Sequence, residues 1–131
     1  MLGETTDRVY AGLDRRFDGV LFVLGTTGSY AGVTWQYWNG TAWTNLPLSL
    51  SYQLNGTGGI IRFAMPSDWT TRLLNGVQAN DTGLATGDVA AGTAKYWIRG
   101  SATTITTVAT LNYARPFAEY SYTTPTIVRR F

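Results

Sequence analysis

The sequence contains neither cysteine nor histidine among its 131 residues. Without cysteine there are no disulfide bonds and no thiolate metal sites, so stability must come from packing or from assembly. Without histidine the chain lacks the commonest general base and metal ligand, and Ser-His and Cys-His catalytic arrangements are excluded. These absences favour a binding or structural protein over an enzyme, and we expect neither a metal nor another cofactor.

Charge is also scarce, because charged residues make up 14% of the chain against about 25% in an average globular protein. The net charge of +2 is small and scattered, whereas a nucleic-acid binder carries a basic patch or stripe. Only Lys95 among the ten basic residues is a lysine. Arginine is enriched at protein interfaces, although residue usage in the source organism explains the same bias.

Long apolar runs are missing as well. The N-terminal residues 1–8 contain no apolar segment of the kind found in a secretory signal, and no stretch is long enough to cross a bilayer. We therefore expect a chain that is made in the cytoplasm, without a membrane partner.

The chain is instead rich in Thr, Gly, Tyr and Trp, a composition that suits half-buried pleated sheets. Residues 33–43 hold three of the five tryptophans and read as one β-hairpin. Val33, Trp35 and Tyr37 alternate with more polar positions, the two-residue period of a strand with one buried face. The pair at 39–40, Asn-Gly, predicts a two-residue type I′ turn with positive φ at both positions.

Further strands are predicted from apolar runs between Gly, Pro and Asn turns. They cover 9–13, 20–24, 49–54, 60–65, 94–99 and 103–111, with a helical turn at 66–74 and a break at 113–117. The run at 20–24 is apolar on both faces, which is typical of a central strand. The sum is an all-β fold, a jelly-roll-like β-sandwich of about eight to nine short antiparallel strands.

Three parts of the chain follow from this pattern. Residues 1–8 form an N-terminal arm, 9–118 the β-sandwich domain and 119–131 an extended C-terminal tail. The Gly-rich residues 75–93 form one long loop, which either contacts a neighbouring subunit or is a mobile insertion.

The search for catalytic residues finds little. A glycosidase needs two facing carboxylates, but the acidic residues fall mostly in turns and nothing in their spacing pairs them. The run at 56–59, Gly-Thr-Gly-Gly, lacks the lysine of a phosphate-binding loop, and Asp81 and Asp88 do not follow a calcium-loop pattern.

Surface aromatics are the remaining candidates. Alternation sends Trp38 to the face opposite Trp35 and Tyr37, where with Trp43 or Tyr30 it would form a flat stacking platform for a sugar ring. The competing interpretation is that both faces are buried, one in the core and one beneath a loop or a neighbouring subunit. Tyr120, Tyr122 and Phe131 of the tail are further candidates for contact with a partner.

Four segments together resemble a known group of proteins. They are Phe17-Asp18-Gly19-Val20-Leu21-Phe22, Trp35-Gln36-Tyr37-Trp38-Asn39-Gly40-Thr41-Ala42-Trp43, Pro66-Ser67-Asp68-Trp69 and Tyr96-Trp97-Ile98-Arg99. In this order they resemble β-sandwich domains of virion structural proteins of tailed bacteriophages and related viruses. The similarity covers roughly residues 9–111, and loop 75–93 and the tail match no motif.

The resemblance implies assembly and no reaction. It suggests a non-enzymatic capsid decoration (cement) protein or a small tail or neck component, located in the virion and made in the host cytoplasm. Its partners would be major capsid or tail proteins, together with copies of itself in a trimer or ring. Loop 75–93 and the terminal arms would make the contacts. The alternative is a carbohydrate-binding module that recognises host glycans through exposed Trp38 and Trp43.

Overall fold

The computed structural model describes residues 2–3, 5, 8–73 and 94–118. These residues form ten β-strands, and the described part of the chain contains no helix. The strands are β1 Val9–Leu13, β2 Gly19–Thr26, β3 Ser29–Ala31, β4 Thr34–Trp38, β5 Trp43–Asn45, β6 Leu48–Leu50, β7 Gly58–Phe63, β8 Tyr96–Ser101, β9 Thr104–Thr107 and β10 Thr110–Phe117.

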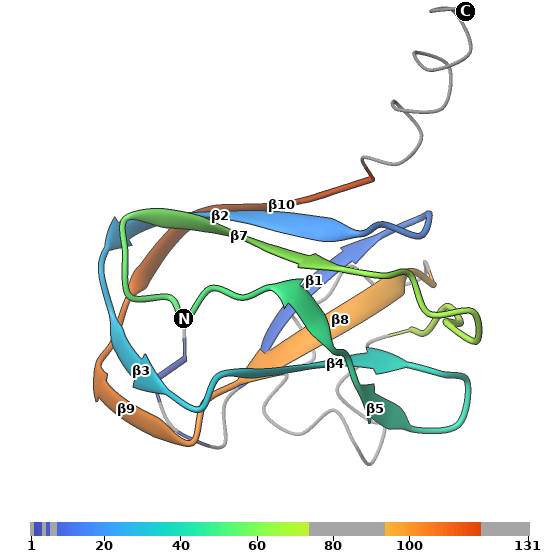
Figure 1. The fold of residues 1–131 in the computed structure, drawn as a ribbon, viewed down its shortest axis with the longest axis horizontal. Coiled ribbons are helices and arrows are strands. Elements are labelled where there is room, and N and C mark those ends of the chain that lie inside the picture. Colours follow the sequence, from blue (N-terminus) through green and yellow to red (C-terminus); the bar gives the residue numbers. More distant parts are fainter. Residues whose placement is uncertain (1, 4, 6–7, 74–93, 119–131) are drawn as a thin grey trace, which may run out of the picture.

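Two four-stranded antiparallel sheets pack face to face, as Figure 1 shows. One has the strand order β1-β8-β4-β5 and the other the order β10-β2-β7-β6. The short pair β3-β9 lies at one end of the sandwich. The all-β sandwich expected from the sequence is therefore confirmed.

Strand β2 lies between β10 and β7, as its apolar sequence predicts. Val20, Phe22 and Leu24 are buried on its inner side, opposite strands that contribute Ile61 and Ala114. Leu21 and Val23 on the other side are only half-buried. The strand is thus central in its sheet, but one of its apolar sides faces outward.

Trp69 is the centre of an aromatic cluster that joins the two sheets. Its ring lies 4.9 Å from that of Phe17 and 5.7 Å from that of Tyr96, with Phe63 and Tyr37 within 6.4 Å. The indole N–H of Trp69 donates to the carbonyl of Trp97 at 3.2 Å. Edge-to-face pairs of this kind stabilise a core by about 0.5–1.5 kcal/mol each beyond area burial.

The helical turn predicted at 66–74 is wrong for the residues that the structure describes. Residues 66–69 form a single tight turn, in which the amide of Trp69 donates to the carbonyl of Pro66 at 3.4 Å. The chain then continues extended, and Arg72 forms a bridge with Lys95. Trp69 explains the difference, since a ring this deeply buried fixes the path of its backbone.

The strand predicted at 103–111 is in fact two strands. Residues 104–107 pair with β3, and the chain crosses to the other sheet at 108–109 before β10 pairs with β2. The break predicted at 113–117 is also wrong, since this segment is the longer part of β10. Pro116 is tolerated because β10 is an edge strand, where one side of the backbone needs no ladder donor.

The hairpin turn also differs from the prediction. Four residues, 39–42, connect β4 to β5, and only Gly40 has a positive φ, of 97°. The side-chain oxygen of Asn39 accepts hydrogen bonds from the amides of Thr41 and Ala42 at 2.9 and 2.8 Å. Asparagine thus caps the loop with its side chain and does not itself adopt the left-handed conformation.

Two smaller differences concern the ends of elements. Of the strand predicted at 49–54, only residues 49–50 lie in a strand, β6. Leu54 lies in the core with a positive φ of 61°. Leu2 of the predicted arm is buried, and its carbonyl accepts a hydrogen bond from the Tyr30 hydroxyl at 3.2 Å. The start of the chain is therefore attached to the sandwich at this point.

Candidate interaction surfaces

The two tryptophans singled out in the sequence lie side by side. Trp38 ends β4 and Trp43 begins β5, and the two residues are paired across the hairpin. Their ring centroids are 5.7 Å apart in an edge-to-face arrangement. Tyr10 and Trp97 pack against them, and we call these four residues the Trp38 cluster.

Two guanidinium groups cover the Trp38 cluster. Arg72 lies over the Trp38 ring with 3.8 Å between the guanidinium carbon and the ring centroid, and Arg99 lies 4.5 Å from the centroid of Trp43. Arg99 is fixed by a 2.9 Å hydrogen bond from its Nε to the side-chain oxygen of Gln36. Stacked, partly desolvated guanidinium groups of this kind make favourable cation–π interactions with indole rings.

The prediction that Trp38 and Trp43 are exposed is wrong, since each is only 9% exposed. The competing interpretation, in which the second face of the hairpin is also covered, describes the structure. Part of that cover is Arg72, which follows Trp38 by more than thirty residues in the sequence. Nothing in the local pattern around the hairpin pointed to it, and the arginine bias of the sequence was interpreted as a sign of protein interfaces or of residue usage.

The other candidate residues of the sequence lie beyond the described part of the chain. These are Tyr120, Tyr122 and Phe131 of the tail, together with loop 75–93 and its Asp81 and Asp88. Their predicted roles stay predictions.

The structure adds a surface that the sequence did not suggest, on the outward side of β10, β2, β7 and β6. Residues directly opposite one another on neighbouring strands point to the same side, so the register defines this surface. We call it the Tyr113 face. Its three rows are Tyr113-Val23-Gly58, Arg115-Leu21-Ile60 and Phe117-Gly19-Arg62-Leu50.

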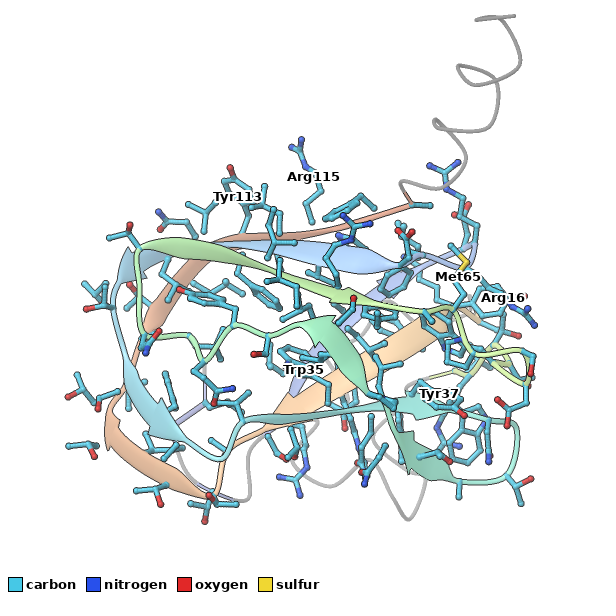
Figure 2. All side chains as sticks on the ribbon, in the orientation of Figure 1. Arg16, Trp35, Tyr37, Met65, Tyr113 and Arg115 are labelled. Carbon is cyan, nitrogen blue, oxygen red and sulfur yellow. The ribbon has the colours of Figure 1, made fainter. Side chains whose placement is uncertain are left out.

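The Tyr113 face is apolar and open. Leu50, Ile60 and Tyr113 are 51%, 38% and 47% exposed, among the most exposed large apolar side chains that the structure describes. Figure 2 shows the Tyr113 and Arg115 side chains projecting from β10 away from the body of the sandwich. Exposed apolar side chains that gather on one side of a sheet are candidates for an interaction site.

The arginines of the Tyr113 face lie against its aromatic rings. Arg115 stacks on Tyr113 at 5.8 Å and Arg62 on Phe117 at 5.6 Å. The far end of the Phe117 ring lies over Gly19, where a Cβ atom would meet its Cζ atom at 2.4 Å. Glycine at position 19 therefore lets the ring bridge from β10 toward β7.

Little in the described residues supports catalysis. The three acidic residues that the structure describes, Asp14, Asp18 and Asp68, all lie outside the strands. Asp68 accepts a 2.9 Å hydrogen bond from the Tyr37 hydroxyl. Burial, helped by this bond and by the carboxylate charge, raises the pKa of Tyr37. No group of three potential metal-ligating side chains occurs among the described residues.

Two pockets lie away from the Trp38 cluster. One, of about 360 Å³, is lined by Asp18, Phe63, Ala64 and Met65. The other, of about 310 Å³, lies where the chain crosses from β5 to β6 and includes Trp35 and Pro47 in its walls. Among the described residues that line them, the first has one carboxylate, that of Asp18, and the second has none, so these residues do not form the carboxylate pair of a glycosidase.

The fold and its surfaces define an all-β sandwich with one covered and one open outer face. Comparison with protein-family models, with curated proteins and with solved structures finds no match to this chain.

Proposed function

We propose that this chain is a non-enzymatic structural protein of a virus particle, a capsid decoration protein or a small tail or neck component. The observation that carries the proposal is the Tyr113 face, an open apolar surface on the outer side of a four-stranded sheet. Such a surface is expected in a protein that stays bound to a neighbouring protein. The sequence motifs resemble those of bacteriophage virion proteins, and this resemblance indicates that the assembly is a virus particle.

The motif residues have a structural role in this fold. Phe17, Trp35, Trp69 and Ile98 are all buried in the core, and Tyr96 packs against it. The motifs therefore encode the packing of a sandwich, which agrees with a family whose members share a fold and no reaction.

The size of the Tyr113 face favours assembly in many copies. Its rows are about 7 Å apart and its strands about 4.8 Å apart, which makes a patch on the order of 200–300 Å². A stable one-to-one interface buries about 800 Å² on each partner. One copy would therefore bind weakly, whereas linked copies on a repeating scaffold gain about 10²–10⁴ in overall affinity.

A homotrimer or ring would link the copies in this way. Loop 75–93 and the two terminal arms, residues 1–8 and 119–131, are the parts that the sequence predicts to make such contacts. Because the loop and the C-terminal arm lie outside the described residues, the Tyr113 face is the surface on which the proposal rests.

Quantitative mass spectrometry of purified particles tests the proposal. We expect the chain in particles at a fixed ratio to the major capsid or tail protein, and the ratio should survive density-gradient purification and a salt wash. Absence of the chain from particles, or a ratio that varies between preparations, would contradict a structural role.

A further inference from the structure

We propose that the cavity at the crossing from β5 to β6 binds a small uncharged molecule that carries an amide group on an apolar body. In this site the indole N–H of Trp35 donates to the carbonyl oxygen of the amide. The residues that line the cavity are not residues of the Tyr113 face, so the inference goes beyond the proposed function and does not depend on it.

Trp35 carries a buried donor without an acceptor. Its side chain is 3% exposed, and among the described residues no atom accepts a hydrogen bond from its indole N–H. Trp69 and Trp97 differ, since each donates its indole N–H to a backbone carbonyl, at 3.2 and 2.9 Å. Buried donors in folded proteins nearly always have a partner, because an unpaired one is unfavourable. A molecule that brings an acceptor to Trp35 therefore gains affinity.

The orientation of the Trp35 ring directs this N–H toward the cavity. Figure 2 shows Trp35 between the two sheets, and its six-membered ring lies over Gly100 of β8, where a Cβ atom would be 2.9 Å from it. The N–H belongs to the five-membered ring at the other end of the indole, away from β8. On that side of β4 the amide of Leu46 donates to the Trp35 carbonyl at 2.9 Å. The cavity, of about 310 Å³, has both residues in its walls.

The lining of the cavity indicates the chemical class of the ligand. Among the described residues that line it there is no Asp, Glu, Lys or Arg, which favours an uncharged molecule. A volume of about 310 Å³ is at the low end for ligand pockets, so the molecule is small. The apolar walls are Val33, Trp35, Leu46, Pro47 and Leu48, and the polar side chains, all exposed at the mouth, are those of Thr34, Asn45 and Ser51.

An amide on an apolar body fits this lining better than water or a hydrocarbon does. A bound water needs about two to four polar partners, and the side chains of Leu46, Pro47 and Leu48 at the crossing offer neither donor nor acceptor. A hydrocarbon would cover these walls but leave the Trp35 N–H unpaired. An amide supplies a carbonyl oxygen for that N–H, and its own N–H can donate to the side-chain oxygens at the mouth.

Nuclear magnetic resonance of the isotope-labelled full chain tests the inference, because each of the five tryptophans gives one indole N–H signal. The probe is acetanilide, which is an acetamide on a benzene ring. The control probe is N-ethylaniline, in which a methylene group replaces the carbonyl. We expect acetanilide to move the assigned Trp35 indole signal to lower field in a saturable titration, as a new hydrogen bond does. N-ethylaniline should bind about tenfold more weakly.

Two variants test whether the probe binds in the cavity. Ser51→Phe places a large side chain at the mouth, and Ser49→Phe is the matched control, since Ser49 is also exposed but does not line the cavity. We expect Ser49→Phe to bind acetanilide as wild type does, and Ser51→Phe to bind it about tenfold more weakly. Circular dichroism verifies that both variants fold, and the comparison of the two probes on wild type needs no variant.

Three outcomes would overturn the inference. The first is an unchanged Trp35 signal up to the solubility limit of acetanilide, which would mean that water alone meets the N–H. The second is equal affinity for acetanilide and N-ethylaniline. The third is an unchanged affinity for acetanilide in a folded Ser51→Phe protein. None of these results depends on whether the chain is present in virus particles, so the proposed function is tested separately.

Discussion

Tyr113 lies opposite Val23, although Leu111, only two residues earlier, lies opposite Leu24. One extra residue, Asn112, is therefore accommodated in β10 as a β-bulge, and a second irregularity between Thr110 and Leu111 leaves Gly25 extra in β2. Because side chains alternate with a period of two, the bulge lets Leu111 and Ala114, which are three residues apart, lie on the same side of the strand. Leu111 and Ala114 consequently pack on the core, and Tyr113 and Arg115 point outward to form the Tyr113 face.

Deletion of Asn112 should therefore be tolerated, because Leu111, Tyr113, Ala114 and Arg115 would then alternate as in a regular strand and would keep their partners and sides. Asn112→Ser, which keeps the extra residue, should be tolerated as well. Far-ultraviolet circular dichroism and urea unfolding measure both variants. A deletion variant that is unfolded, or whose urea midpoint falls far below that of wild type, would contradict the assignment of Asn112 as the extra residue.

Gly100→Ala should destabilise the sandwich by about 1–3 kcal/mol, the usual cost of overpacking a core. A Cβ atom at position 100 would lie 2.9 Å from the six-membered ring of Trp35, which crosses over this glycine from the neighbouring strand. Gly56→Ala is the control, since the nearest atoms there are 3.7 Å away. Equal free energies of unfolding in urea for the two variants would contradict the close packing of Trp35.

Arg72→Ala should uncover Trp38 and shift the tryptophan fluorescence of the folded protein to longer wavelength. The loss of stability should be about 1–2 kcal/mol, because the guanidinium and its aliphatic stem both cover the ring. Arg15→Ala, at an exposed turn position, should change neither quantity. An unchanged emission maximum in Arg72→Ala would mean that other groups keep water from Trp38.

The Tyr37–Asp68 hydrogen bond predicts a dependence of stability on pH. The pKa of Tyr37 is raised above 10.0 in the folded protein, so the folded state holds this proton more tightly than the unfolded state does. The corresponding stabilisation is complete below about pH 10 and is lost as the pH rises through the folded pKa.

Tyr37→Phe lacks this proton, so its free energy of unfolding should fall less steeply than that of wild type above pH 10. Asp68→Asn removes the carboxylate charge but leaves the burial of Tyr37, the largest cause of the shift, and should give an intermediate slope. Urea titrations at several alkaline pH values measure the slopes. Parallel curves for wild type and Tyr37→Phe would contradict the raised pKa.

The strands with strong periodicity were predictable from the sequence. The predicted strand at 9–13 has the bounds of β1, and the run at 20–24 lies within the central strand β2. Burial of Trp35 and Tyr37 on one face followed from alternation. These predictions succeed because each depends on side chains within one segment.

The features that were missed depend on distant residues. Pro116 reads locally as a break, and only its edge position in the sheet makes it acceptable. Arg72 covers Trp38 through a path fixed by the buried ring of Trp69. The Tyr113 face arises from the register of four strands and a bulge at Asn112, none of which a single segment encodes.

Hydroxyl-radical footprinting of purified particles and of the free chain, read by mass spectrometry, tests the central claim most directly. In particles we expect Leu50, Ile60 and Tyr113 to lose reactivity several-fold, while Val108, which is equally open and lies off the face, keeps it. Equal reactivity of the three face residues in particles and in the free chain would contradict the account of the Tyr113 face as the surface of assembly.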